Sequence, residues 1–246
     1  KDPSTGKLKL KYGWAAKELL DSDYIDHLEG KKSIGVQPCN DDGLSNFGAI
    51  DIDSDEYDNF DLRKYLEIID KKNIPVVPVK SKSGGLHIYV FFKEPVKASF
   101  VRNFLDKLLF TFSLKASTEI FPKQTQLGTG SDGKFINGNF INLPYYNRNE
   151  RVGLNLDGTE FTFEQFLKVV EANKKTKEEI EEFATELMRL ELTGGADEFA
   201  DGPVCLQRLS KSKLDDYRDR FIYNYMVFAK KKYPDNWEEK LLEGAR

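Results

Sequence analysis

Short β-prone runs separated by helical runs fill roughly the first two thirds of the chain. The β-prone runs alternate apolar and polar positions or are rich in β-branched and aromatic residues. They lie at 33–38, 47–53, 74–81, 84–92, 117–122 and 138–146. The first two are separated by the turn-forming segment 40–46, so the pattern favours a hairpin between them.

Helical periodicity places amphipathic helices over residues 60–72 and 99–114, between the predicted strands. This alternation predicts an α+β domain spanning residues 1–158. After about residue 160 no strand is evident, and the pattern predicts a small all-helical C-terminal domain, residues 159–246.

Capping boxes and apolar faces define the helices of this C-terminal part. Thr162 with Gln165, and Thr176 with Glu179, have the spacing of capping boxes. They predict helix starts near residues 163 and 177. The composition of residues 193–203 predicts a linker. The last two helices are expected at 215–234 and, as a short helix, after Asp235.

Composition narrows the class of protein without naming a function. The chain has 246 residues, 39% of them hydrophobic, which is typical of a globular protein. Its net charge of −4 is not the basic charge typical of nucleic-acid-binding proteins. Its two cysteines form no metal or disulfide pattern, which suits a reducing cytoplasm. No apolar run is long enough to cross a membrane, and a cytoplasmic monomer is expected.

Asp51 and Asp53 are the first candidates for chemistry. Alternate residues of a strand share a face, so the two carboxylates point the same way while Ile50 and Ile52 point into a core. Neighbouring carboxylates repel unless a cation neutralises them, and hard oxygen ligands suit Mg²⁺ or Mn²⁺. The alternative is that these acids simply begin a solvated acidic turn over residues 54–58.

The segment 79–92 is the second candidate, because Lys, Ser and Gly residues lead directly into a strand. Such residues can cradle a phosphate with hydroxyl, ammonium and backbone donors, although the Walker A spacing is absent. His87 lies on the strand itself, opposite in direction to Leu86 and Ile88. The alternatives are a tight turn and a buried, hydrogen-bonded core histidine.

Glu119 is the third candidate, in the β-prone run 117–122. A third carboxylate would complete an oxygen ligand set for two cations. Taken alone, Glu119 fits equally well with the exposed glutamates that are common in strands.

In order along the chain, the segments containing FGAIDID, KSKSGGLHIYVFF, STEIFPKQ and GNFINLPYY resemble the archaeo-eukaryotic primase superfamily. The likeness covers roughly residues 24–150 and is greatest to the primase-polymerases of phages, plasmids, mobile elements and CRISPR-linked systems. The resemblance implies an RRM-like sheet packed with a second α/β unit. It also implies a nucleotidyltransferase that makes primers and extends them on a template.

The resemblance assigns roles to particular residues. Asp51, Asp53 and Glu119 would bind two divalent ions, Mg²⁺ or Mn²⁺, and together with His87 form the catalytic set. Further nucleotide contacts would come from residues of the Ser/Lys/Gly segment and from two later segments. This nucleotide-binding set is Lys80, Ser81, Lys82, Ser83, Gly84, Gly85, His87, Lys123, Asn139 and Asn142.

The implied partners are a single-stranded DNA template, dNTPs or NTPs, and a helicase that is fused or separate; no zinc-binding cysteine set is present. Two other functions remain open at this point. One is a metal-dependent nuclease or phosphohydrolase that uses the same carboxylates to activate water. The other is a non-catalytic nucleic-acid-binding initiation module.

Overall fold

A four-stranded antiparallel sheet forms the centre of the molecule, and its strand order is β3-β4-β2-β5. The computed structural model describes residues 18–129, 135–136, 138–192, 203, 206 and 218–244. The central elements are β2 (Leu44–Ile52), α2 (Leu62–Lys71), β3 (Val77–Lys80), β4 (Leu86–Lys97), α3 (Ala98–Thr111) and β5 (Glu119–Phe121). Their βαββαβ succession and strand order are those of a ferredoxin-like or RRM-like unit, so the predicted α+β class is confirmed.

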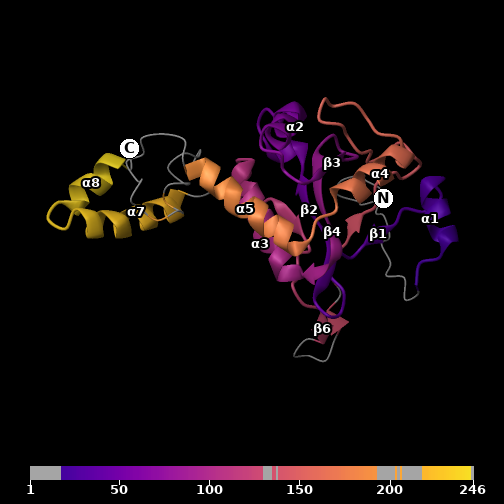
Figure 1. The fold of residues 1–246 in the computed structure, drawn as a ribbon, viewed down its shortest axis with the longest axis horizontal. Coiled ribbons are helices and arrows are strands. Elements are labelled where there is room, and N and C mark those ends of the chain that lie inside the picture. Colours follow the sequence, from indigo (N-terminus) through magenta and orange to yellow (C-terminus); the bar gives the residue numbers. More distant parts are fainter. Residues whose placement is uncertain are drawn as a thin grey trace, which may run out of the picture.

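Helices α2, α3 and α5 (Lys177–Leu192) cover one face of this sheet, and Figure 1 shows α3 and α5 on the side of the strands opposite α4. Ile50 and Ile52 of β2 are fully buried in the core beneath these helices, as the strand pattern predicted. The core is continuous from Leu66 of α2 through Leu105 of α3 to Ile180 of α5. Each such buried side chain contributes roughly 1.5–3 kcal/mol to stability.

The other face of the sheet carries a second apolar cluster, which includes Ala49, Tyr89 and Phe121. It is covered by α4 (Phe163–Asn173), through Phe166, and by the chain segment around Tyr145. Buried apolar side chains therefore cover much of both faces of the sheet and exclude water from them. Asp51 and His87 lie on this second face, toward one end of the strands.

The predicted hairpin between residues 33–38 and 47–53 is wrong. The first run contributes β1 (Gly35–Val36), which pairs antiparallel with β8 (Ile141–Asn142) and not with β2. The two-residue strand β1 gains its pairing from a segment more than 100 residues away in sequence. Turn chemistry at 40–46 indicated a local pairing, but tertiary packing selected the distant partner.

The capping boxes predicted for α4 and α5 are confirmed. Gln165 N–H donates to Thr162 Oγ1 while Thr162 N–H donates to Gln165 Oε1. The Thr176 and Glu179 pair forms the same reciprocal bonds. Each box satisfies backbone donors that the first turn of a helix leaves without partners.

The division at residues 158 and 159 stays a prediction. Phe166 of α4 and Ile180, Ala184 and Leu187 of α5 belong to the two cores of the sheet. Removing these helices would expose both cores. We propose that the first unit extends through α5 and that any boundary follows it.

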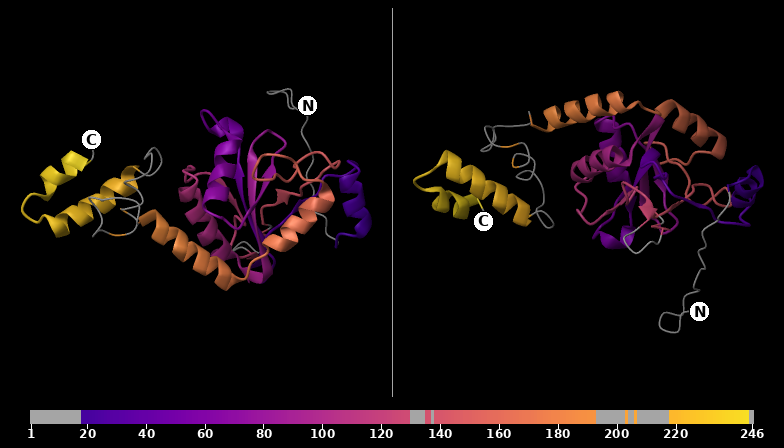
Figure 2. Two further views of the ribbon diagram at one scale, coloured as in Figure 1. Left: turned by 45° about the horizontal axis from the view of Figure 1, so that its top comes forward. Right: turned by 90° about the horizontal axis from the view of Figure 1, so that it is seen from below.

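The last helices, α7 (Arg218–Lys232) and α8 (Trp237–Gly244), form a pair beyond the end of α5 (Figure 2). Phe221, Tyr225 and Phe228 of α7 pack with Leu206 in a third cluster, against which Phe110 of α3 also packs. The predicted linker falls almost wholly outside the described residues.

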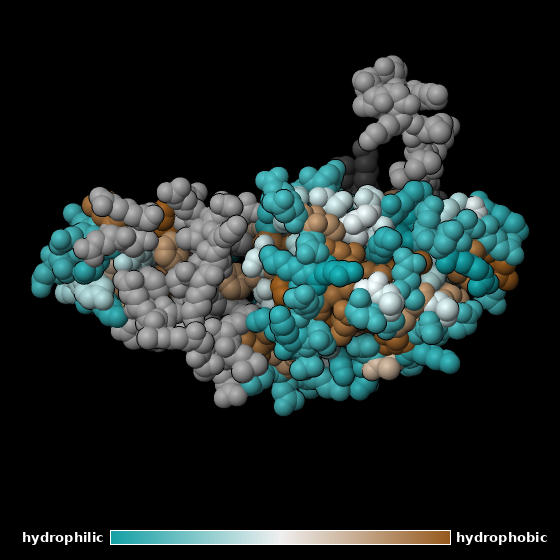
Figure 3. Space-filling view, turned by 90° about the horizontal axis from the view of Figure 1, so that it is seen from above, coloured by the Kyte–Doolittle hydropathy of each residue, from teal (hydrophilic) through white to brown (hydrophobic). Residues whose placement is uncertain are grey.

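The remaining elements are short and lie at the margins. They are α1 (Asp21–Leu28), the 3-10 turn η1 (Ser54–Glu56), β6 (Gly128–Thr129) and β7 (Phe135–Ile136). Seen from above, polar residues dominate the described surface, and apolar residues show between them over the central body (Figure 3). No helix within the described ranges is long and apolar enough to span a bilayer.

Candidate functional site

One cross-strand row brings three of the predicted catalytic residues together. Asp51 of β2 is paired in register with His87 of β4 on one side and with Glu119 of β5 on the other. Residues paired across neighbouring antiparallel strands place their side chains on the same face, about 5 Å apart. The three segments are far apart in sequence, and the sheet alone makes them neighbours.

Asp53 lies just past the end of β2, where the chain turns into η1. Its pKa is raised, first by burial and then by the negative charges of Asp51, Asp55, Glu56 and Glu119. Asp51 and Glu119, the other two predicted metal ligands, are thus among the charges that act on Asp53. The acidic turn over residues 54–58 is partly exposed to solvent, and it begins next to the row formed by His87, Asp51 and Glu119.

His87 is buried, and both of its ring nitrogens face polar side chains. Nε2 lies 3.1 Å from Asp51 Oδ1. Nδ1 lies 3.4 Å from the Tyr89 hydroxyl, which in turn donates to the Asn142 carbonyl oxygen at 3.5 Å. Burial raises the pKa of Tyr89 well above its usual range, so this hydroxyl stays protonated.

Asp51 Oδ1 is a buried carboxylate oxygen for which the described part of the chain supplies no hydrogen bond. The nearby His87 Nε2 is at ion-pair distance, but its direction is not that of a hydrogen bond. Buried polar atoms in native proteins nearly always have partners. An orphaned carboxylate oxygen is therefore consistent with a cation as its missing partner.

Glu119, the third acid of the row, is engaged by Lys123. Lys123 Nζ donates to Glu119 Oε1 at 2.5 Å, and the same ammonium lies 5.1 Å from the centre of the Phe121 ring. Lys123 was predicted to contact the nucleotide, and in this structure its ammonium contacts the Glu119 carboxylate.

The Ser/Lys/Gly segment is fastened beside the end of β2. A Cβ atom at Gly85 would come within 2.1 Å of the Ile52 carbonyl oxygen, so only glycine allows this approach. Ser54 Oγ donates to the Ser83 carbonyl, and Ser81 Oγ lies 3.0 Å from Ser83 Oγ. Gly84 takes a φ of +88°, which closes the turn. The predicted cradle therefore lies next to Asp53.

Three other residues predicted to contact the nucleotide, Lys80, Lys82 and Asn139, have side chains bound to protein groups. Lys80 pairs with Glu160 at 3.3 Å and Lys82 with Glu150 at 3.1 Å. Gln124 Nε2 donates to Asn139 Oδ1, and the Asn139 backbone N–H donates to Gln124 Oε1. Asn142 is part of β8, and its backbone carbonyl accepts from the Tyr89 hydroxyl next to the row.

The donor set fits a hard divalent cation, although the carboxylates do not converge as they stand. Three carboxylates supply oxygen ligands of the kind Mg²⁺ and Mn²⁺ take. Nevertheless, in the described ranges no group of three or more His, Cys, Asp or Glu side chains is arranged to hold a metal ion. Two of the three acids are turned to nitrogen atoms, Asp51 to His87 and Glu119 to Lys123.

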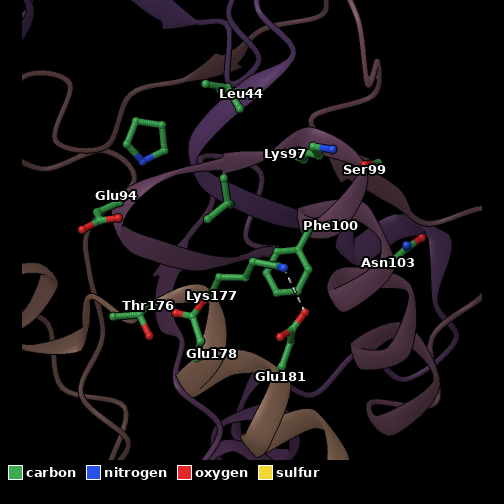
Figure 4. A pocket seen from close by; sticks show the side chains of 12 residues that line it. Leu44, Glu94, Lys97, Ser99, Phe100, Asn103, Thr176, Lys177, Glu178 and Glu181 are labelled. Atoms are coloured by element: carbon green, nitrogen blue, oxygen red, sulfur yellow. Dashed lines mark ion pairs between the residues drawn. The ribbon is translucent and has the colours of Figure 1, made fainter.

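Two hollows flank the sheet, and only one belongs to this site. A hollow of about 330 Å³ opens beside Glu119 and Lys123, with Arg102 and Asp106 on its α3 wall. A second hollow, of about 600 Å³, lies where the end of β4 meets the starts of α3 and α5. There the Lys177 side chain passes the Phe100 ring to reach Glu181, and none of the predicted site residues lines it (Figure 4).

Tyr89 and Arg102 belong to the surroundings of the site and were not predicted. Tyr89 is two residues after His87 on the same strand, so strand alternation places it on the same face. Arg102 donates from Nη1 to the carbonyl oxygens of Pro122 and Lys123, and no sequence signal links α3 to that turn.

Comparison with known proteins gives one family. A search of curated proteins found no match. The sequence profile described as the TOTE conflict system, Archaeo-Eukaryotic Primase domain, matches residues 7–183, well over half of the 246 residues. The matched region contains the whole sheet and the acidic row. The chain therefore belongs to the archaeo-eukaryotic primase superfamily, in its TOTE conflict system family.

Proposed function

We propose that this protein is a template-dependent DNA primase-polymerase, which transfers nucleotides from dNTPs or NTPs to a 3′-hydroxyl to make and extend primers. The proposal depends chiefly on the row formed by His87, Asp51 and Glu119, with Asp53 beside it. Nucleotidyltransferases generally make up this superfamily, and they typically depend on divalent metal ions.

Asp51, Asp53 and Glu119 are the proposed ligands for two divalent cations. When bound, such cations neutralise the charge of a triphosphate and favour attack by the 3′-hydroxyl. The register of β2 with β5 makes Asp51 and Glu119 cross-strand neighbours, so their side chains must only turn from His87 and Lys123 toward a shared cation. The unsatisfied Asp51 Oδ1 is the atom that gains most from a cation.

His87 and the segment 80–85 are the proposed contacts for the nucleotide phosphates. His87 can turn Nε2 from Asp51 to a phosphate oxygen without leaving its strand, because only its ring must rotate. The serine hydroxyls of the segment lie close together beside Asp53 and can donate to the same anion. Lys80, Lys82 and Lys123 would have to exchange their present carboxylate partners for phosphate.

The test is nucleotide incorporation on single-stranded DNA with Mg²⁺ or Mn²⁺, with and without an annealed primer. We expect wild-type protein to give template-dependent product. Asp51→Asn should lower the rate by about three orders of magnitude, the scale of losing a group that stabilises transition-state charge. The matched control is Asp70→Asn, an exposed acid on α2, which should leave the rate unchanged.

Other outcomes separate the alternatives. Degradation of the template by wild type, but not by Asp51→Asn, would show a nuclease. Equal incorporation by wild type and Asp51→Asn would contradict the proposed site. Binding of the template without either reaction would favour a non-catalytic module.

A further inference from the structure

The contact of Lys123 with Glu119 is a feature of this site that the proposed reaction does not explain. Its ammonium contacts Glu119 Oε1, and Glu119 is the proposed metal ligand paired with Asp51 across the sheet. The side chains are partly exposed, 30% for Lys123 and 51% for Glu119. A cation of the protein itself therefore lies where a divalent cation would need an oxygen.

The chain on either side of Lys123 is clamped, so this contact is built into the fold. Arg102 of α3 donates to the carbonyl oxygens of Pro122 and Lys123 at 2.8 and 2.9 Å. The next residue, Gln124, is held by the reciprocal amide pair with Asn139. These bonds fix the turn after β5, in which Lys123 lies next to Glu119 at the start of that strand.

A hollow beside Glu119 offers the Lys123 side chain a second position. Lys123 lines the hollow of about 330 Å³ beside Glu119, and the same hollow is lined by Asp106 and Ser117. A lysine side chain is long and flexible, and a partly exposed ion pair holds its two charges only weakly. The ammonium can therefore leave Glu119 without any change in the backbone.

We propose that the Lys123 ammonium is a counter-ion for the carboxylates of this site. It binds Glu119 in the cation-free protein and leaves Glu119 when a divalent cation binds. This inference rests on the proposed function, because it concerns the same carboxylates. Lys123 and the divalent cation compete for the Glu119 carboxylate. The site therefore needs a higher free concentration of divalent cation to be occupied than it would without Lys123. Once released, its ammonium can occupy the hollow beside Glu119 that Asp106 and Ser117 also line.

The test is Mn²⁺ binding without nucleotide or template, measured by electron paramagnetic resonance of the free ion. Lys123→Met should bind Mn²⁺ about threefold or more tightly than wild type, since one partly exposed ion pair no longer competes. Lys123→Arg keeps the charge and should bind as wild type does. The matched control is Lys71→Met, which removes another i,i+4 lysine–glutamate pair, with Glu67, on the exposed face of α2.

Asp51→Asn makes the two possible failures distinguishable. If Asp51→Asn weakens Mn²⁺ binding but Lys123→Met binds no more tightly than wild type, the counter-ion proposal is overturned and the proposed site stands. If Asp51→Asn binds Mn²⁺ as wild type does, the proposed site itself is overturned, and the inference with it. Thermal unfolding of each variant checks that the fold is retained.

Discussion

The chain has two histidines, both buried, and the regions around them differ in one respect. At the junction of α1, β1 and β8, the hydrogen bonds of His27 to described residues go to backbone groups: Nδ1 accepts from Ile34 N–H at 3.1 Å and Nε2 donates to the Pro144 carbonyl at 3.0 Å. At the end of the sheet, the ring nitrogens of His87 face the side chains of Asp51 and Tyr89. Backbone partners cannot move away, whereas side-chain partners can.

This difference teaches that burial alone does not identify a functional histidine. His27 uses both ring nitrogens to fasten three segments, and its tautomer follows from that network. His87 retains a choice of partner beside an unsatisfied carboxylate. We therefore expect substitutions at His27 to lower stability and substitutions around His87 to lower activity. The following tests check whether the two effects are separate.

The largest effect in this pair of regions should follow His87→Gln. We expect nucleotide incorporation to fall about a hundredfold, as for loss of a residue that orients a metal ligand. The free energy of unfolding should change by less than about 1 kcal/mol, because no backbone group loses its partner. Steady-state incorporation and urea unfolding of the same preparation measure both quantities, and an unchanged rate would remove His87 from the site.

The reverse result is expected for His27→Ala. The Ile34 N–H and the Pro144 carbonyl would lose their partner in a buried place, which should destabilise the fold by about 2 kcal/mol. Incorporation per folded molecule should stay within about twofold of wild type. Urea unfolding monitored by circular dichroism checks the first expectation, and a large loss of activity in folded protein would contradict the second.

Acid should act on stability through His27. Burial lowers the pKa of His27 below its ordinary value of 6.5 in the folded protein. The unfolded chain therefore binds a proton first as the pH falls below about 6.5, and stability declines by at most about 1.4 kcal/mol per pH unit until the folded pKa is reached. Comparing unfolding of wild type and His27→Gln from pH 7.5 to 5 measures this; equal pH dependence in the two would contradict it.

The smallest effect is expected at Asp53. Its pKa is raised in the folded protein, so ionisation near neutral pH opposes folding, and this loss disappears as the pH falls below the ordinary value of 3.8. Asp53→Asn should stabilise the cation-free protein at pH 7, by no more than about 1 kcal/mol because the group is partly screened by solvent. Thermal unfolding in EDTA checks the sign, and destabilisation would contradict it.

Local patterns predicted the elements of the fold well, and long-range pairing poorly. The strands containing Asp51, His87 and Glu119 were each predicted from their alternation, and the capping box at Thr162 from its spacing. The pairing of β1 with β8 was missed, because a two-residue strand carries no information about a distant partner.

The residues of the candidate site were proposed from the sequence, and their roles stay predictions, whereas their contacts could not be predicted. The alternation predicted that Asp51 and Asp53 share a strand face, but β2 ends at Ile52 and Asp53 lies where the chain turns into η1. The sequence cannot show the register that puts His87 and Glu119 on either side of Asp51, because packing of the whole sheet sets that register. The Lys123–Glu119 contact depends on a turn clamped by Arg102 of α3, which no local pattern encodes.

The most direct test of the central claim is a crystal structure of the protein grown with Mn²⁺ and a non-hydrolysable nucleotide, with the ion located by its anomalous scattering. The account predicts anomalous peaks about 2.2 Å from carboxylate oxygens of Asp51, Asp53 and Glu119. It also predicts Lys123 turned away from Glu119 and triphosphate oxygens near His87 and the segment 80–85. Mn²⁺ bound elsewhere, with Asp51 still facing His87 and Glu119 still paired with Lys123, would contradict it.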